Sequence, residues 1–356
     1  MNNLKVVELA SVLAGPAVGM FFAELGAQVI KIENKTTGGD VTRSWKLPSE
    51  DPEAEGSAYF YSVNYHKEYL LLDLQSLTDR EKVYDILRGC DIVISNFKKS
   101  SAVKLGMDYE TVKKLNPTVI YGQIYGLNEE DDTPAFDVVL QAEAGFMYIT
   151  GERGRKALKM PIAMVDLLAA HQLKEGILIA LLERTRTQKG AFVSTSLYEA
   201  AVASLANQAT NWLMAGQIPQ RIGSEHPNIA PYGDVFTTLD NKEIVLACGT
   251  EKQWQNLCKV LGIEKQIVDK RFETNALRVK NRPQLVEILR GCIKGYKQDN
   301  LLEILRAAQI PAGGIRNMQE VFETAAAQNM ILTEPLTETA VTKRVKTVAF
   351  KIFYNE

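Results

Sequence analysis

The stretch KVVELASVLAGPAVGMFFAELGAQVIKIE, residues 5 to 33, decides the fold class. Its two ends, residues 5–10 and 28–33, are runs rich in Val and Ile that predict strands, and residues 16–27 between them predict a helix that begins at Pro16. A strand, a helix and a strand in one short unit predict two parallel strands joined by a right-handed crossover. The expected fold class is therefore α/β with a parallel sheet.

The same alternation continues outward from this unit. Further strand-like runs lie at residues 69–75, 90–97, 118–126 and 191–197, separated by charged helical segments. The segment from Asp166 to Gly190 predicts a helix of about six turns, and residues 198–216 predict another long helix. Three prolines within residues 218–234 mark a boundary, and residues 235–248 beyond it predict a hairpin that turns at Asp240 and Asn241.

Composition limits the classes of function. The 356 residues favour two domains, and 46% apolar with 24% charged residues is typical of a globular protein. A net charge of -2 gives no electrostatic footprint for nucleic acid, and no apolar run approaches the roughly 20 residues that span a bilayer. The four cysteines are scattered without a C-x-x-C pair or a histidine cluster, so we expect no disulfide framework, no metal and a cytoplasmic protein; they are Cys90, Cys248, Cys258 and Cys292.

The strand-helix-strand opening also invites a dinucleotide-binding interpretation, because Glu33 ends the second expected strand. The glycines argue against it. Residues 9–19, LASVLAGPAVG, lack G-x-G-x-x-G, and Pro16 removes an amide donor that a pyrophosphate would use.

A collinear series of motifs gives a different indication. The motifs are VLAGPAVGMFFAELGAQVIKIE (12–33), GGDVTRSW (38–45), LLLDL (70–74), ISNFKKSSAVKLGMDYETVKKLNP (94–117), GQIYG (122–126), AFD (135–137), MVDLLAAHQLKEGILIALLERTRTQKGAFVSTSLYEA (164–200) and RIGSEHPNIAPYGDVFTTLDNKEIVLACGTEKQWQNLC (221–258). From about residue 4 to residue 262 the chain resembles the family III CoA-transferases, also called the CaiB/BaiF family. The resemblance implies a Rossmann-like large domain, a smaller α+β domain and an interlocked homodimer. The implied ranges are 1–200 and 325–356 for the large CoA-binding domain, 225–312 for the small domain, and 201–224 and 313–324 for the linkers.

Asp166 interrupts a run of small apolar side chains at the start of a predicted helix. By its position alone it is the N-cap of that helix, where Asp is among the favoured residues. By the resemblance it is the catalytic nucleophile, because a carboxylate can attack a thioester carbonyl to give a mixed anhydride and expel CoA thiolate. Both roles are compatible.

The resemblance also implies a binding site for coenzyme A, as acyl-CoA substrate, at the carboxyl ends of the strands. Relatives carry an Arg toward CoA where this chain has Asn34, and commonly an Arg where it has Lys104, so these phosphate contacts differ here. Lys98 and its neighbour Lys99 are expected near the phosphates. The implied cofactor-binding positions are Val12, Leu13, Ala14, Asn34, Leu72, Asp73, Gln75, Asn96, Phe97, Lys98 and Lys104.

Two other functions remain open. The alpha-methylacyl-CoA racemases resemble this chain too, but their reaction needs a His at the start of the AFD segment, and this chain has Phe136 there. A CoA-binding protein without turnover is the third candidate, against which the presence of Asp166 argues. The expected partners are an acyl-CoA and a carboxylic acid, whose identities the sequence does not specify.

Overall fold

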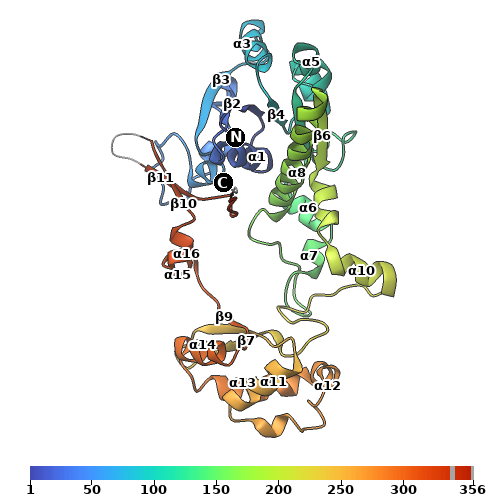
Figure 1. Ribbon diagram of the computed structural model, residues 1–356, viewed down its shortest axis with the longest axis vertical. Coiled ribbons are helices and arrows are strands. Elements are labelled where there is room, and N and C mark those ends of the chain that lie inside the picture. The colour runs from blue at the N-terminus through green and yellow to red at the C-terminus, as the bar shows by residue number, and fades with distance from the viewer. Residues whose placement is uncertain (337–340, 354–356) are drawn as a thin grey trace. The chain divides into compact units, whose positions relative to one another are not determined.

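Residues 1–336 and 341–353 are described by the structure, a computed structural model (Figure 1). The chain divides into two compact units. The first, the sheet unit, comprises Met1–Phe146, Lys159–Ile218 and the described residues from Gln328 onward. The second, the small unit, comprises Met147–Leu158 and Pro219–Ala327.

The sheet unit contains a six-stranded parallel sheet, which confirms the predicted fold class. Its order is β3-β2-β1-β4-β5-β6, the order of a doubly wound dinucleotide-type sheet. The direction of winding reverses between β1 and β4, so the carboxyl ends of these two strands open a crevice for a ligand. The strands are β1 (Lys5–Leu9), β2 (Gln28–Asn34), β3 (Lys67–Leu72), β4 (Ile92–Ser95), β5 (Ile120–Tyr125) and β6 (Ala191–Ser196).

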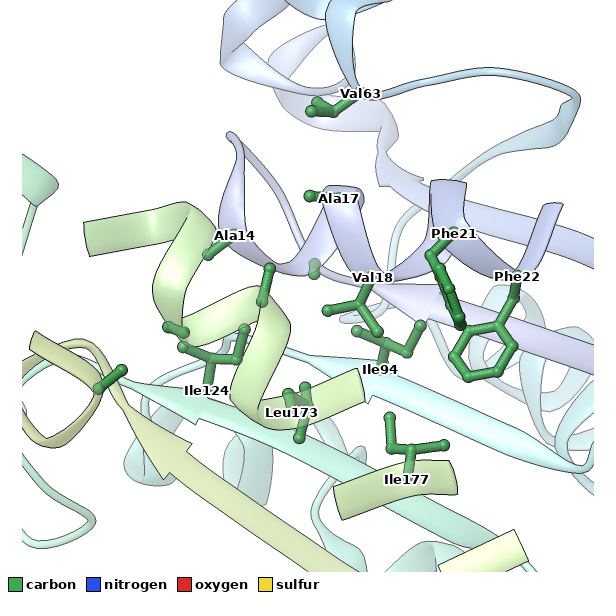
Figure 2. Packing of buried hydrophobic residues seen from close by; sticks show 14 of the residues in the cluster. Ala14, Ala17, Val18, Phe21, Phe22, Val63, Ile94, Ile124, Leu173 and Ile177 are labelled. Atoms are coloured by element: carbon green, nitrogen blue, oxygen red, sulfur yellow. The ribbon is translucent and has the colours of Figure 1, made fainter. Parts of the chain in front are cut away.

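Helices cover both faces of this sheet. On one face, α1 (Ala14–Glu24) and α8 (Met164–Thr187) pack against each other and against the strands, and Val18 and Leu173 meet Ile94 in a shared core (Figure 2). On the other face, α3 (Leu77–Leu87) and α5 (Tyr109–Leu115) cover the sheet. Each fully buried Val, Leu or Ile contributes about 1.5 to 3 kcal/mol, so these apolar contacts fix both layers.

The first helix differs in detail from the sequence prediction. It begins at Ala14 rather than at Pro16. Pro16 therefore lies in the first turn, where its missing N–H has no intrahelical partner to lose. Gly15 allows the close approach of this helix to the end of β1, because a Cβ there would lie 2.2 Å from the Cβ of Ala10.

The long helix predicted over residues 198–216 is two helices, α9 (Leu197–Ala203) and α10 (Ala206–Ala215). The Ser204 hydroxyl donates to the carbonyl of Ala200 at 2.8 Å, and Ala206 has a φ of 48°. A left-handed residue interrupts the helical ladder, and neither Gly nor Pro marks the place. The prediction was wrong because the chain has no Gly or Pro at this place to signal the break.

The small unit has a three-stranded antiparallel sheet in the order β7 (Tyr232–Thr237), β8 (Glu243–Ala247) and β9 (Ala312–Gly314). The predicted hairpin is confirmed, and Asn241 in its turn has a φ of 56°. Trp254, Phe272 and Leu289 lie in its core. Its main helices are α11 (Glu251–Val260), α12 (Asn275–Lys280), α13 (Arg282–Ile293) and α14 (Gln298–Ala307).

The remaining elements are short. No described helix is both long enough and apolar enough to cross a membrane. The short elements are α2 (Ala58–Ser62), α4 (Lys99–Leu105), α6 (Asp137–Glu143), α7 (Phe146–Ile149), α15 (Met318–Phe322) and α16 (Ala325–Gln328), the 3-10 helices at Lys35–Thr37, Val41–Ser44 and Glu264–Gln266, and the antiparallel pair β10 (Ile331–Pro335) and β11 (Val341–Val345).

Candidate active site

The loops that follow β1 and β4 are joined at the point where the sheet winding reverses. The Ser11 N–H donates to Asn96 Oδ1 at 3.1 Å, and Asn96 Nδ2 donates to the Ser11 carbonyl at 2.9 Å. This reciprocal pair fixes the two loops whose side chains were predicted to contact CoA.

Two adjoining cavities lie along this edge of the sheet and share Ser11 and Phe97. The first, the Asp166 cavity, is lined by the loops after β1, β4 and β5 and by the starts of α6 and α8. It brings Asp166 together with six predicted positions, which are Val12, Leu13, Ala14, Asn96, Phe97 and Lys98. The second, the β2–β3 cavity, contains the predicted positions Asn34, Leu72, Asp73 and Gln75, with Phe97 again.

Lys104 and Asn34, two positions at which the resemblance implies phosphate contacts, do not point to such contacts in the structure. Lys104 is exposed in the last turn of α4 and lines neither of these two cavities among the residues described. The Asn34 side chain accepts hydrogen bonds from the Thr36 N–H at 2.9 Å and from its hydroxyl at 2.8 Å, so it caps a local turn. Lys99 forms ion pairs with Glu129 at 3.1 Å and with Glu130 at 2.7 Å. Of the three lysines, Lys98 is therefore the one at the cavity wall.

Asp166 is not the N-cap of its helix, so that interpretation was wrong. The N-cap of α8 is Ala163, which makes no side-chain capping bond, and Asp166 lies in the first turn. The Asp166 residue is only 8% exposed although it lines a cavity. Its carboxylate is therefore held at the cavity wall with little access to water.

Electrostatics disfavour the charged form of this carboxylate. Burial raises the pKa of Asp166 to about 7, and the negative charge of Asp137 adds to the rise. Within residues 1–336 and 341–353, no hydrogen bond or ion pair to the Asp166 carboxylate compensates for this. A desolvated carboxylate without a fixed partner is available to react.

Asp137 and Gln141, which the sequence analysis did not single out as site residues, hold the start of α8. Asp137 Oδ1 accepts the Val165 N–H at 2.7 Å, and Asp137 Oδ2 accepts from Gln141 Nε2 at 2.6 Å. Gln141 Oε1 accepts the Met160 N–H at 2.8 Å. The signal was present in the AFD motif and in the i,i+4 spacing of Asp137 and Gln141 on α6.

The walls near Asp166 are aromatic and apolar in part. Phe136 lines the Asp166 cavity, and no histidine does among the described residues. Tyr59, also missed from the sequence, lies within electrostatic reach, since burial raises its pKa to about 12 and Asp166 contributes to that rise. The described part of the chain contains no group of His, Cys, Asp and Glu that could hold a metal ion.

Comparisons with known proteins agree with this arrangement. The family described as CoA-transferase family III matches residues 1–356. The succinate–glutarate CoA-transferase of Agrobacterium fabrum is 35% identical over 334 residues, which are 92% of this chain and 83% of that protein. The acetyl-CoA:oxalate CoA-transferase of Acetobacter aceti is 32% identical over 337 residues, covering 93% and 85% of the two chains.

A solved structure shows the same fold. The crystal structure of a CaiB/BaiF family protein from Brucella suis matches with a TM-score of 0.86 at 36% identity, covering 98% of this chain and 92% of that one. The resemblance predicted from the motifs is confirmed, and this chain belongs to CoA-transferase family III.

Proposed function

We propose that this protein transfers CoA from an acyl-CoA to a carboxylic acid, with Asp166 as the nucleophile. The observation that carries the proposal is a buried carboxylate without a fixed partner in a cavity at the carboxyl edge of the parallel sheet. Its pKa of about 7 leaves a substantial ionised fraction at neutral pH and gives the carboxylate more basicity than an exposed aspartate has.

The reaction proceeds in four balanced steps. Asp166 attacks the thioester carbonyl, the C–S bond breaks, and a mixed anhydride and CoA thiolate result. The thiolate attacks the aspartyl carbonyl, releases the donor acid and leaves an aspartyl-CoA thioester. The acceptor carboxylate then attacks that thioester and expels the thiolate, which attacks the acyl carbon of the acceptor and restores the free carboxylate. The thioester bond energy is retained throughout.

The protein's own groups position these steps. Asp137 and Gln141 accept hydrogen bonds from the backbone before and at the start of α8. They thereby hold the Asp166 carboxylate in a defined position for its attack on the thioester. Lys98 supplies positive charge at the wall for an anionic part of the substrate.

Hydroxylamine trapping tests the mechanism. Incubation with an acyl-CoA and hydroxylamine should give an aspartyl hydroxamate at Asp166, found by peptide mass spectrometry, and Asp166→Asn should give none. An active enzyme that leaves Asp166 unmodified would refute the covalent step. Deuterium uptake at the alpha carbon of an acyl-CoA without CoA exchange would instead indicate a racemase, and unaltered activity in Asp166→Ala would indicate a different catalytic group.

The acceptor is proposed to be a short dicarboxylic acid, because the named relatives act on succinate, glutarate and oxalate. A matrix of acyl-CoA donors against monocarboxylic and dicarboxylic acids, followed by mass spectrometry of the CoA products, measures this preference. Faster transfer to monocarboxylic acids of equal length would contradict it.

A homodimer in the cytoplasm completes the proposal. Three large apolar side chains of α10, Trp212, Leu213 and Met214, are exposed by 54%, 78% and 83%, and this exposure supports association with a second chain. Light scattering should give twice the 39.6 kDa chain mass. The mass of a single chain would refute the dimer. The free thiols of all four cysteines suit a reducing compartment.

A further inference from the structure

Four charged side chains are buried together beneath the loop that follows β1. They form the buried quartet, defined as Glu8, Lys31, Asp40 and Lys67, and the side chain of each is 0% exposed. Removing an ion from water costs several kcal/mol even after relaxation, so such groups persist where they are paired or where they serve a site.

The four side chains of the quartet form a row in which positive and negative charges alternate. Lys67 Nζ lies 2.8 Å from Glu8 Oε2, Glu8 Oε1 lies 2.8 Å from Lys31 Nζ, and Lys31 Nζ lies 3.1 Å from Asp40 Oδ2. Both ammonium groups also donate hydrogen bonds to backbone carbonyls. Lys31 Nζ donates to the carbonyl of Ala10 at 2.6 Å, and Lys67 Nζ donates to that of Pro16 at 2.9 Å. The two positive and two negative charges thus balance, and each charged group has more than one polar partner.

Asp40, the last of these four charged side chains, contacts the wall of the ligand cavity. Asp40 Oδ2 accepts the Val12 N–H at 3.1 Å, while Asp40 Oδ1 accepts from the Thr42 N–H at 3.0 Å and from its hydroxyl at 2.8 Å. Burial opposes ionisation, but the charge of Lys31 and the bonds from Thr42 outweigh it and lower the pKa of Asp40. Asp40 is therefore a fixed, ionised acceptor for the backbone amides of Val12 and Thr42.

Val12 needs such an acceptor because its backbone is strained. Its φ is 70°, in the left-handed region, and a β-branched residue adopts that conformation rarely. The strain is of order 1 to 3 kcal/mol and persists only where the surroundings impose it. Val12 lines the Asp166 cavity, and Ser11 beside it lines both cavities.

We propose that Asp40 is a positioning residue that holds Val12 in this left-handed conformation and so shapes the wall that receives CoA, with Lys31, Glu8 and Lys67 keeping Asp40 in place. The proposal rests on the proposed function only in taking CoA as the ligand. A purely structural quartet would change the stability of the protein and leave the affinity of the folded protein for CoA unchanged.

A double-mutant cycle tests the link between Asp40 and Val12. The dissociation constant of CoA is measured by calorimetry for the wild type, Asp40→Asn, Val12→Gly and the double variant. Asp40→Asn should weaken binding by about 5- to 150-fold, the equivalent of releasing the strain at Val12. Because glycine adopts positive φ without steric strain, the same substitution in the Val12→Gly protein should weaken binding by no more than about threefold.

Equal losses in both backgrounds, or wild-type affinity in Asp40→Asn, would overturn the proposal. If Asp40→Asn does not fold, Thr42→Val replaces it, since it removes one hydrogen bond to Asp40 and should weaken CoA binding in the same direction; unchanged binding refutes the proposal. Hydrogen exchange gives a second readout: deuterium uptake in peptides covering residues 10–14 should rise in Asp40→Asn, and unaltered uptake counts against the role.

The outcomes separate this inference from the proposed function. If CoA affinities follow the expected double-mutant cycle but no hydroxamate forms at Asp166, the covalent mechanism alone is refuted. Hydroxamate formation with unchanged CoA affinity in Asp40→Asn refutes the positioning role alone. A wild-type protein that binds no CoA refutes both.

Discussion

The raised pKa of Asp166 predicts that this carboxylate destabilises the folded protein at neutral and alkaline pH. In the folded state its pKa is about 7, compared with the ordinary aspartate value of 3.8, and this difference corresponds to about 4 kcal/mol. Between these two values the folded state binds more protons at this site than the unfolded state does. The free energy of unfolding therefore falls as pH rises through this window, and the full penalty is present above pH 7.

Asp166→Asn removes this titration. Relative to the wild type, the variant should gain about 2 to 3 kcal/mol in the free energy of unfolding between pH 5 and pH 8. Urea unfolding followed by circular dichroism at both pH values measures the gain. The decisive quantity is its change with pH, because a buried amide also alters packing by an amount that does not depend on pH.

Asp132→Asn is the matched control, since Asp132 is exposed and lies outside both cavity walls. Its stability relative to the wild type should stay constant over the same range. If the difference between Asp166→Asn and the wild type is the same at pH 5 and pH 8, the inferred burial and charge repulsion at Asp166 are refuted.

Three further outcomes follow from the described contacts. Asp137→Asn keeps an oxygen for its backbone bond but removes the charge that adds to the effect of burial on the pKa of Asp166, so the rising limb of kcat/KM against pH should move to lower pH; a move to higher pH contradicts the role proposed for Asp166. Gly19→Ala should lower the free energy of unfolding by about 2 to 4 kcal/mol, because its Cβ would lie 1.8 Å from the buried Glu8 Oε2, whereas Gly89→Ala, with open space around it, should change little in the same denaturation assay. Arg282→Met leaves the buried carboxylate of Asp234 without its ion-pair partner, which lies 3.0 Å away in the wild type. Calorimetry should therefore show the small unit destabilised by about 3 to 5 kcal/mol, and an unchanged unfolding transition would refute that pairing.

The strands were predictable because their signal is local. The central strands β1, β2 and β4 contain short runs of Val and Ile, and burial on both faces of a parallel sheet favours that composition. The break between α9 and α10 was not predictable, because it depends on the left-handed conformation of Ala206 and on no breaker residue.

The site divides in the same way. The choice of Asp166 and of the loop positions after the strands follows from the resemblance to the family, and the structure places them at one edge of the sheet, where the carboxyl ends of parallel strands meet. The role of Asp137 does not, because Asp137 and Val165 are 28 residues apart and their bond exists only in the folded chain. A local interpretation therefore gave Asp166 the capping position, while the helix start is in fact held by a carboxylate from another helix.

The buried charges explain why the chemistry itself lay beyond local patterns. Glu8, Lys31 and Lys67 lie in β1, β2 and β3, and all three are buried although charged side chains are rarely buried. Their partners come from β1, β2, β3 and the loop of Asp40, so none of the pairings has a sequence signature of its own. The same fold buries these four charges together and, among the described residues, gives Asp166 no ion pair. In the mechanism that we propose, the paired buried charges hold the wall at Val12, while Asp166, which has no ion pair among the described residues, acts as the nucleophile.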